Sequence, residues 1–226
     1  MQWFDRDGAC LDRWGARGAG VGQLEDPAGV AVAADGTLAV ADTWNGRIQL
    51  LSTDGTAAVV ASGLYGPRGV LWWRDGRLFI ADTGNQRLLQ WRRGMAEPTQ
   101  LVKLDAKPFG LAAAGDRLAV ALPTRSRVVL LDPDTGEQRG EVAVPVWPAA
   151  PETEACLATL PDGRLVASAG LAGELWLVDP NSGGVTRLAS GLDGVTGIAV
   201  LPDGRLVAAL TRDHRLERLS VTIPPR

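Results

Sequence analysis

Histidine, cysteine and long apolar runs are scarce in this sequence, and each scarcity excludes a class of protein. His214 is the only histidine among 226 residues, which excludes a zinc or iron site built from several histidines. The two cysteines, Cys10 and Cys156, can form one bridge at most, and neither lies in a C-x-x-C or metal-ligand spacing. No stretch approaches the ~18 apolar residues that span a bilayer, and the N-terminal MQWFDRDGAC lacks the basic and apolar regions of a signal peptide. We therefore expect a soluble chain with no visible export signal, and its compartment stays open.

Concentrated charge of one sign is also absent. The chain has 23 basic and 26 acidic residues, a net charge of -3, and no run of like charges. This balance predicts no general attraction to nucleic acid or to an anionic membrane. With 46% hydrophobic residues the composition is that of an ordinary globular protein, and a chain of this length needs no disulfide or metal in order to fold.

What the sequence does contain is a repeat of about 41 residues, the first feature to seek because it decides the fold. A leucine that opens a strand after a turn recurs at spacings of 40, 40, 47 and 41 residues. These leucines are Leu38, Leu78, Leu118, Leu165 and Leu206. A second landmark agrees, and its residues are Gly29, Gly69, Gly110, Cys156 and Gly197.

Each repeat has the pattern of four short strands. In the first repeat GVAV, TLAVADT, RIQLLST and AAVVAS are separated by D-G and other polar turns. Short runs rich in Val, Leu and Ile between such turns are typical of β-hairpins, and no segment sustains the 3.6-residue period of a helix. Four antiparallel strands in each repeat predict one blade of a β-propeller.

The first two repeats resemble a known family. LEDPAGVAVAADGTLAVADTWNGRIQLLSTDG is similar to the NHL repeat, GPRGVLWWRDGRLFIADTGNQRLLQW follows the same pattern, and GQLEDP before the first repeat is typical too. The resemblance covers nearly the whole chain and is weaker in the last three repeats. It implies a β-propeller that acts mostly by binding a partner. Propellers that resemble this fold also include gluconolactonase-like lactonases, lyases that use channel histidines, and RNA-binding members with a strongly basic face.

We predict an all-β fold, a single propeller over residues 1–226 with five blades of four antiparallel strands. The repeats extend over approximately 26–66, 67–107, 108–147, 148–192 and 193–222, and residues 1–25 close the ring. MQWFDRDGACLDRWG aligns with the outer half of a blade, and the last repeat stops before its fourth strand. The strand around Cys10 to Trp14 is therefore expected to complete the last blade. One strand is left over, since MQWFD and RLERLSV both align with a third strand, and this surplus keeps a six-bladed or oligomer-completed arrangement open.

The turn between the second and third strands recurs in the first two repeats. It reads DTWNGR and DTGNQR there, whereas the later repeats have LPTRSR, AGLAGE and LTRDHR. A short Asp side chain at a strand end accepts hydrogen bonds from backbone N–H groups of its own turn, and Asn tolerates the left-handed conformation. We interpret the recurring residues as a structural turn and not as a catalytic or metal site. They are Asp42, Asn45, Arg47, Asp82, Asn85 and Arg87.

The predicted channel has too few ligands for a metal-dependent enzyme. Its inner strands, GVAV, GVLWW, GLAAA, CLATL and GIAVL, contain no acid, no Asn and no His, whereas calcium takes about six to eight oxygens. The channel mouth is formed by Ala28, Arg68, Phe109, Ala155 and Thr196, with the single carboxylate of Glu154 nearby. His214 is interpreted as a turn residue. We expect no catalysis, no metal and no cofactor, and the alternative is a divergent lactonase or lyase.

One face of the propeller carries residue types that are enriched at binding sites. The connection at residues 144–156 is about six residues longer than its counterparts, which fits either a binding loop or a stiff crossover. The candidates on this face are Trp44, Tyr65, Arg68, Phe109, Arg125, Trp147, Glu152, Glu154 and Arg212. We expect a non-catalytic scaffold that binds a protein or peptide partner there, with a small molecule as a further option. RNA binding is a distant third, because the arginines are balanced by acids.

Overall fold

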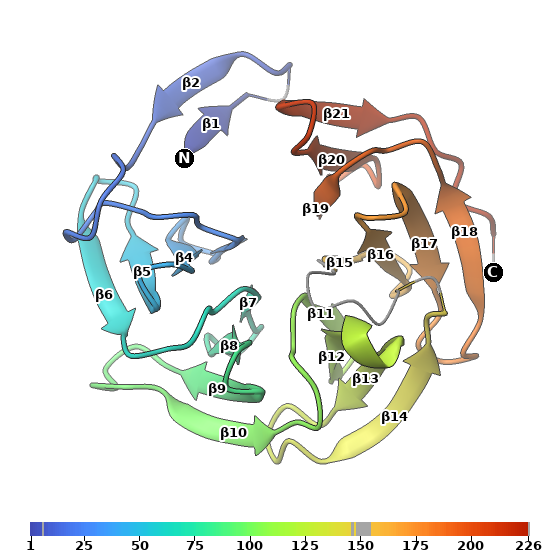
Figure 1. Ribbon diagram of the computed structural model, residues 1–226, viewed down its shortest axis with the longest axis horizontal. Helices are drawn as coiled ribbons and strands as arrows, with labels where there is room; N and C mark the ends of the chain where they lie inside the picture. Colours follow the sequence, from blue (N-terminus) through green and yellow to red (C-terminus); the bar gives the residue numbers. More distant parts are fainter. Residues whose placement is uncertain (6, 146, 148–154, 226) are drawn as a thin grey trace.

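The protein folds as a ring of antiparallel sheets. The structure is a computed structural model that describes residues 1–5, 7–145, 147 and 155–225. In these residues the one helical element is a short 3-10 turn, η1 (Pro123–Arg125). Five sheets follow one another round a central axis in chain order, with a two-stranded hairpin between the last sheet and the first (Figure 1). The predicted all-β propeller with five blades is confirmed.

In each blade the strands follow chain order from the axis outward (Figure 1). Blade 1 has β3 (Gly29–Val32), β4 (Leu38–Asp42), β5 (Arg47–Leu51) and β6 (Ala57–Ala61). Blade 2 has β7 (Val70–Trp72), β8 (Leu78–Asp82), β9 (Arg87–Trp91) and β10 (Thr99–Lys103). Blade 3 has β11 (Leu111–Ala114), β12 (Arg117–Leu122), β13 (Arg127–Leu131) and β14 (Gln138–Ala143). Blade 4 has β15 (Leu157–Thr159), β16 (Leu165–Ala169), β17 (Glu174–Val178) and β18 (Val185–Ala189). Blade 5 has β19 (Val195–Val200), β20 (Leu206–Leu210) and β21 (Arg215–Leu219).

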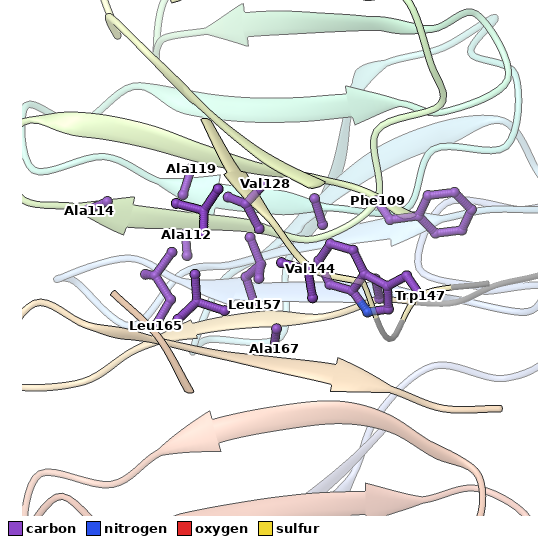
Figure 2. Close-up of a cluster of buried hydrophobic side chains, with 14 of the residues drawn as sticks. Phe109, Ala112, Ala114, Ala119, Val128, Val144, Trp147, Leu157, Leu165 and Ala167 are labelled. Atoms are coloured by element: carbon purple, nitrogen blue, oxygen red, sulfur yellow. The ribbon is translucent and has the colours of Figure 1, made fainter. Parts of the chain in front are cut away.

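Apolar side chains on both faces of the middle strands hold the blades together. β4 and β8 are buried along their whole length. β8 lies between two blades, and β4 lies between blade 2 and a cluster that includes Leu24, Met1 and Trp14 of the N-terminal segment. The clusters of buried side chains accordingly lie between consecutive blades. Figure 2 shows the cluster between blades 3 and 4, in which Phe109, Val144 and Trp147 pack near the inner strands. Burial of apolar surface stabilises the folded state by about 25 cal/mol per Å², so these interfaces are the main stabilising contribution.

The landmark glycine of the repeat lies where adjacent inner strands approach most closely. A Cβ atom on Gly29 would lie 1.9 Å from the carbonyl oxygen of Arg68, and one on Gly69 would lie 2.0 Å from that of Phe109. Both acceptors are backbone atoms of the next blade, which cannot rotate away. Glycine therefore recurs in the first blades because their inner strands leave no room for a side chain, whereas blade 4 has Cys156 at this position.

The N-terminal strands do not complete blade 5. β1 (Gln2–Phe4) pairs with β2 (Cys10–Arg13), and among the described residues β2 has no other strand partner. The expectation that residues 10–14 supply the fourth strand of the last blade is therefore wrong, and that sheet has three strands. The physical reason is that the strand left over in the alignment, β1, lies directly before β2 in the sequence, so the two pair as a local hairpin. The hairpin then occupies its own position between blade 5 and blade 1 (Figure 1).

Candidate binding site on the loop face

The recurring turn of blade 1 fixes the connection that leads into that blade. Asp42 is fully buried, and its Oδ1 accepts a hydrogen bond from the backbone N–H of Glu25 at 2.7 Å. Its Oδ2 accepts from the side chains of Asn45, Arg47 and Gln49. The guanidinium of Arg47 also donates to three carbonyl oxygens of that connection, those of Ala19, Gly20 and Gln23. The carboxylate and the guanidinium thus fasten the Gly-rich segment before the blade to its second and third strands.

Blade 2 repeats this arrangement. Asp82 accepts from the backbone N–H of Tyr65 at 2.9 Å and from the side chains of Asn85 and Arg87. The threonine after each aspartate reaches forward, since Thr83 Oγ1 donates to the carbonyl oxygen of Pro108 at 2.7 Å. Thr43 makes the same bond to Pro67 at 2.8 Å. These hydrogen bonds are those of a turn that joins neighbouring blades, and they leave no oxygen of Asp42 or Asp82 facing a ligand.

The later blades lack this aspartate and build the turn differently. In blade 3 the position is the buried Leu122, and Arg127 forms a bidentate ion pair with Asp105 of the preceding connection, at 2.8 and 2.9 Å. In blade 3 the carboxylate therefore comes from Asp105 in the preceding connection, whereas Arg127 keeps the position of the arginine in the turn. In blade 5 Thr211 bonds to the carbonyl oxygen of Gly194. Sequence comparison of the turns alone did not predict either solution, because the partner lies outside the motif.

The inner strands enclose a central cavity of about 820 Å³. The predicted channel-mouth residues do line it, and they are Ala28, Arg68, Phe109, Ala155 and Thr196. Its wall below the mouth is mainly apolar, with Val30, Val32, Leu71 and Trp72 among the lining side chains. The Arg68 guanidinium lies 5.4 Å from the centre of the Phe109 ring, within the range of a cation–π contact. Phe109 itself is buried and supports Arg68 from below.

Trp44 is the most exposed large apolar side chain on this face, with 76% of its surface accessible. Its indole Nε1 donates a 2.6 Å hydrogen bond to Asp26 Oδ2, so the ring is held in place while its surface stays open to solvent. Both residues line a second cavity of about 560 Å³, together with Arg17, Glu25 and Pro27. Asp26 and Pro27 line the central cavity as well. Asp26 and Pro27 therefore lie where the two cavities meet, and Trp44 is hydrogen-bonded to Asp26 on the side of the second cavity.

Asp26 was not among the residues expected at this site. Its backbone has the left-handed conformation with φ 47°, which is uncommon for a residue other than glycine and is best tolerated by Asn and Asp. The sequence signal was its position in GQLEDP, directly before the first inner strand. Arg17 pairs with the neighbouring Glu25 at 2.7 Å across the rim of the second cavity.

The remaining candidates divide into exposed and buried side chains. Tyr65 is exposed beside the turn of blade 2, and Arg212 pairs with Asp193 at 2.7 Å on the surface of blade 5. Arg125 lies in η1, 3.9 Å from a carboxylate oxygen of Asp105. Glu152 and Glu154 lie outside the described residues.

Trp147 is a correction to the predicted surface. Its side chain is 1% exposed, and its indole Nε1 donates to the carbonyl oxygen of Ser168 at 2.7 Å. The ring fills the interface between blades 3 and 4 (Figure 2), so it is not available to a partner. A tryptophan in a proline-rich connection gives the same sequence signal whether it points outward or inward.

The described side chains that line the central cavity include few groups that could bind a metal ion or act as a nucleophile. Among the described residues no three His, Cys, Asp or Glu side chains lie close enough together to hold a metal ion. Cys156 lines the central cavity, and desolvation raises the pKa of its thiol, which therefore stays protonated and weakly nucleophilic at neutral pH. His214 lies exposed in the turn between β20 and β21. No helix in the described part of the chain is long and apolar enough to cross a membrane.

Comparison with known proteins supports the NHL resemblance and the fold. Residues 24–49 match the model of the NHL repeat, as expected for the first repeat. A search of curated protein sequences finds no match. A streptogramin B lyase structure aligns with a TM-score of 0.68 at 17% identity, over 87% of this chain and 65% of the lyase chain. A virginiamycin B lyase from Staphylococcus aureus aligns with a TM-score of 0.66 at 15% identity, over 88% and 71%. A chain from a nidogen–laminin complex aligns with a TM-score of 0.72 at 14% identity, over 90% and 82%. At these identities the likeness shows the fold.

Proposed function

We propose that this protein is a non-catalytic propeller scaffold that binds a protein or peptide partner on its loop face, with Trp44 as the central contact. The observation that carries the proposal is the geometry of Trp44. An indole that is 76% exposed and also fixed by a 2.6 Å hydrogen bond to Asp26 loses little conformational entropy on binding. Tryptophan in such a setting is the residue type most enriched at interface hot spots.

The surroundings of Trp44 favour a polypeptide as the partner. The second cavity places the Arg17–Glu25 ion pair and the carboxylate of Asp26 round the indole, which matches the polar rim and aromatic centre of protein interfaces. Tyr65, exposed on the next connection, extends the surface toward blade 2. The likeness to a chain of a nidogen–laminin complex adds that propellers of similar shape occur in protein complexes.

The alternative is an enzyme of the lyase or lactonase type, and two similar structures are named as lyases. A lyase or lactonase needs an acid, a base or a metal at the channel. Among the described residues that line the central cavity, Asp26 is the one carboxylate, and it is already hydrogen-bonded to Trp44. Metal-dependent lactone hydrolysis would need several oxygen ligands together. The described chemistry of the cavity therefore favours binding over catalysis.

A peptide selection tests the proposal. A random peptide library displayed on phage is selected against the immobilised protein, and the selected peptides are titrated calorimetrically against wild type, Trp44→Ala and Leu171→Ala. Leu171 occupies the position of Trp44 in the turn of blade 4 and is also exposed, which makes it the matched control. We expect Trp44→Ala to weaken binding about 30-fold, the equivalent of about 2 kcal/mol, and Leu171→Ala to change it less than about two-fold.

Two outcomes contradict the proposal. Equal affinity of wild type and Trp44→Ala shows that the indole is not the contact. Turnover of a streptogramin or of a lactone by the purified protein, lost on Glu154→Gln, would establish the enzyme alternative.

A further inference from the structure

The hairpin β1–β2 lies in the outer part of the ring, where the third and fourth strands of a blade would lie (Figure 1). In its turn Asp5 N–H donates to Ala9 O at 2.9 Å, and Gly8 N–H donates to Asp5 O at 3.1 Å. The turn between β5 and β6 of blade 1 has the same pair of bonds, Ser52 N–H to Thr56 O at 2.9 Å and Gly55 N–H to Ser52 O at 3.0 Å. Turns between first and second strands have such bonds too, for example Ala33 N–H to Thr37 O at 2.8 Å and Gly36 N–H to Ala33 O at 2.9 Å. The position of the hairpin in the outer part of the ring is what assigns β1 and β2 to the third and fourth strands of a blade (Figure 1). The described residues contain no first and second strand in this sector of the ring.

The inner strand of blade 1 is uncovered on the side of this sector. Val30 follows the landmark Gly29 and is 56% exposed, and Val32 on the same side of the strand is 62% exposed. The residues at the position of Val30 in blades 2, 3 and 4 are Val70, Leu111 and Leu157, which are 8%, 6% and 5% exposed because each packs on the preceding blade. The outer part of this face is covered, since Leu38 and Val40 of β4 pack with Leu24 of the N-terminal segment. The uncovered part of the interface surface is therefore the inner strand β3.

Blade 5, on the other side of the sector, also exposes an apolar side chain that is buried in the other blades. Leu216 of β21 is 55% exposed. Its counterparts on the third strands of blades 1 to 4 are all 0% exposed, and they are Ile48, Leu88, Val128 and Leu175. On the inner strand of blade 5, a Cβ on Gly197 would meet only Ala209 of its own blade, whereas Gly29 and Gly69 face the next blade directly. Blade 5 therefore also ends in an uncovered apolar interface.

A hydrogen bond from an arginine to a carbonyl oxygen further round the ring recurs along the chain, and the described residues do not form it at this sector. Arg77, Arg117 and Arg164 hold the same position at or just before the start of a second strand. They donate to the carbonyl oxygens of Pro133 and Pro180 in the outer turns of the following blades and of Pro224 in the segment after β21. Arg205 holds the same position in blade 5 and pairs with Asp203 of its own turn. In the repeating pattern its acceptor would belong to the turn of the β1–β2 hairpin, and no bond between Arg205 and the described residues of that turn is formed. The hairpin is thus not joined to blade 5 as the other blades are joined to each other.

We propose that the sector between blade 5 and blade 1 is a docking site for a β-hairpin of a partner polypeptide. The partner hairpin pairs with the inner edge of β1 and supplies the two inner strands of a sixth blade. Its side chains are apolar on both faces, as on β4, because one face covers Val30 and Val32 and the other covers Leu216. Strand addition of this kind combines backbone hydrogen bonds with burial of alternate side chains.

A second copy of this chain is not the occupant. In the part of the chain that the structure describes, every strand is already paired within its own sheet, so a second copy has no unpaired hairpin to supply. The site is also distinct from the contact proposed on Trp44, and a Trp44→Ala protein should still accept the hairpin. The two proposals can therefore fail separately.

A hairpin taken from the chain itself provides the probe. A synthetic peptide with the sequence of residues 195–210, VTGIAVLPDGRLVAAL, contains the two inner strands of blade 5. It is titrated into the full-length protein, and amide hydrogen exchange is followed at Gln2–Phe4. The variants are Val32→Asp and Leu216→Asp, whose side chains are more than half exposed, and the control is Val59→Asp on the outer strand of blade 1. Circular dichroism verifies that all variants fold.

We expect saturable binding that slows amide exchange at β1, a loss of affinity of at least about ten-fold in both Asp variants, and no change in Val59→Asp or Trp44→Ala. The proposal is overturned by peptide binding that does not saturate or that the Asp variants leave unchanged. It is equally overturned if the protein alone forms a dimer in which the β1 amides are already protected.

Discussion

Replacing Asp42 by Ala tests whether the recurring turn is structural. In the native protein four donors converge on this buried carboxylate, three of them side chains and one the N–H of Glu25. The substitution removes the partner of Arg47, whose side chain is 10% exposed, 2.7 Å from Asp42 Oδ2. The guanidinium keeps its bonds to the carbonyl oxygens of the preceding connection but loses its counter-charge in a place where water cannot replace it.

The magnitude follows from the burial of both partners. Removing one member of a buried ion pair costs about 3 to 5 kcal/mol, because the remaining charge stays desolvated. For a chain of this size about 1 kcal/mol corresponds to about 2 to 4 °C in Tm, so Asp42→Ala should lower Tm by about 6 to 20 °C. Asp82→Ala should lower it less, since the Arg87 side chain is 31% exposed and water can solvate it.

Thermal unfolding of wild type, Asp42→Ala, Asp82→Ala and Asp203→Ala provides the assay. Asp203 also pairs with an arginine but lies on the surface, so its removal should lower Tm much less than that of Asp42. Limited trypsin digestion adds a local readout, because the exposed Arg17 lies in the connection that Arg47 fastens. Faster cleavage there is expected in Asp42→Ala. A Tm of Asp42→Ala equal to that of Asp203→Ala would refute the structural interpretation of the turn.

Two further outcomes follow from the close approach of the inner strands and from the turn carboxylates. Gly69→Ala should lower the free energy of unfolding by about 1 to 3 kcal/mol, because its Cβ would lie 2.0 Å from a backbone oxygen. The measurement is urea denaturation, and the control is Gly140→Ala, whose Cβ would lie 3.6 Å from the nearest side chain. Hydrogen bonds from the backbone and side chain of Thr56 lower the pKa of Asp54, and those of Thr37 lower the pKa of Asp35. Because the folded pKa is below the unfolded value, this stabilisation is present above about pH 4 and is lost as the pH falls through the folded pKa. Acid titration of the free energy of unfolding should show that loss, reduced in Asp54→Asn, and a stability that rises in acid would contradict it.

The sequence by itself determined the strands, the four-stranded blades 1 to 4 and the propeller. Strands alternate apolar and polar residues and end at D-G turns, and both patterns extend over only a few residues, so the sequence alone shows them. The recurrence of Gly29 and Gly69 was visible too, although its reason, the 1.9 and 2.0 Å approach to the next blade, was not. The NHL resemblance of the first repeat rests on the same local residues.

Tertiary structure alone decided what each surface faces. Trp44 and Trp147 were equal candidates in sequence, yet one is held at the rim by Asp26 and the other fills a blade interface. In blade 3 the counter-charge of Arg127 comes from Asp105, 22 residues earlier. β2 pairs with its neighbour β1 and leaves blade 5 with three strands. In the first two cases burial and ion pairing depend on contacts between segments separated in sequence, which short-range periodicity does not reveal. In the third, β2 could pair with β1 or with blade 5, and the periodicity of the strands does not decide between the two.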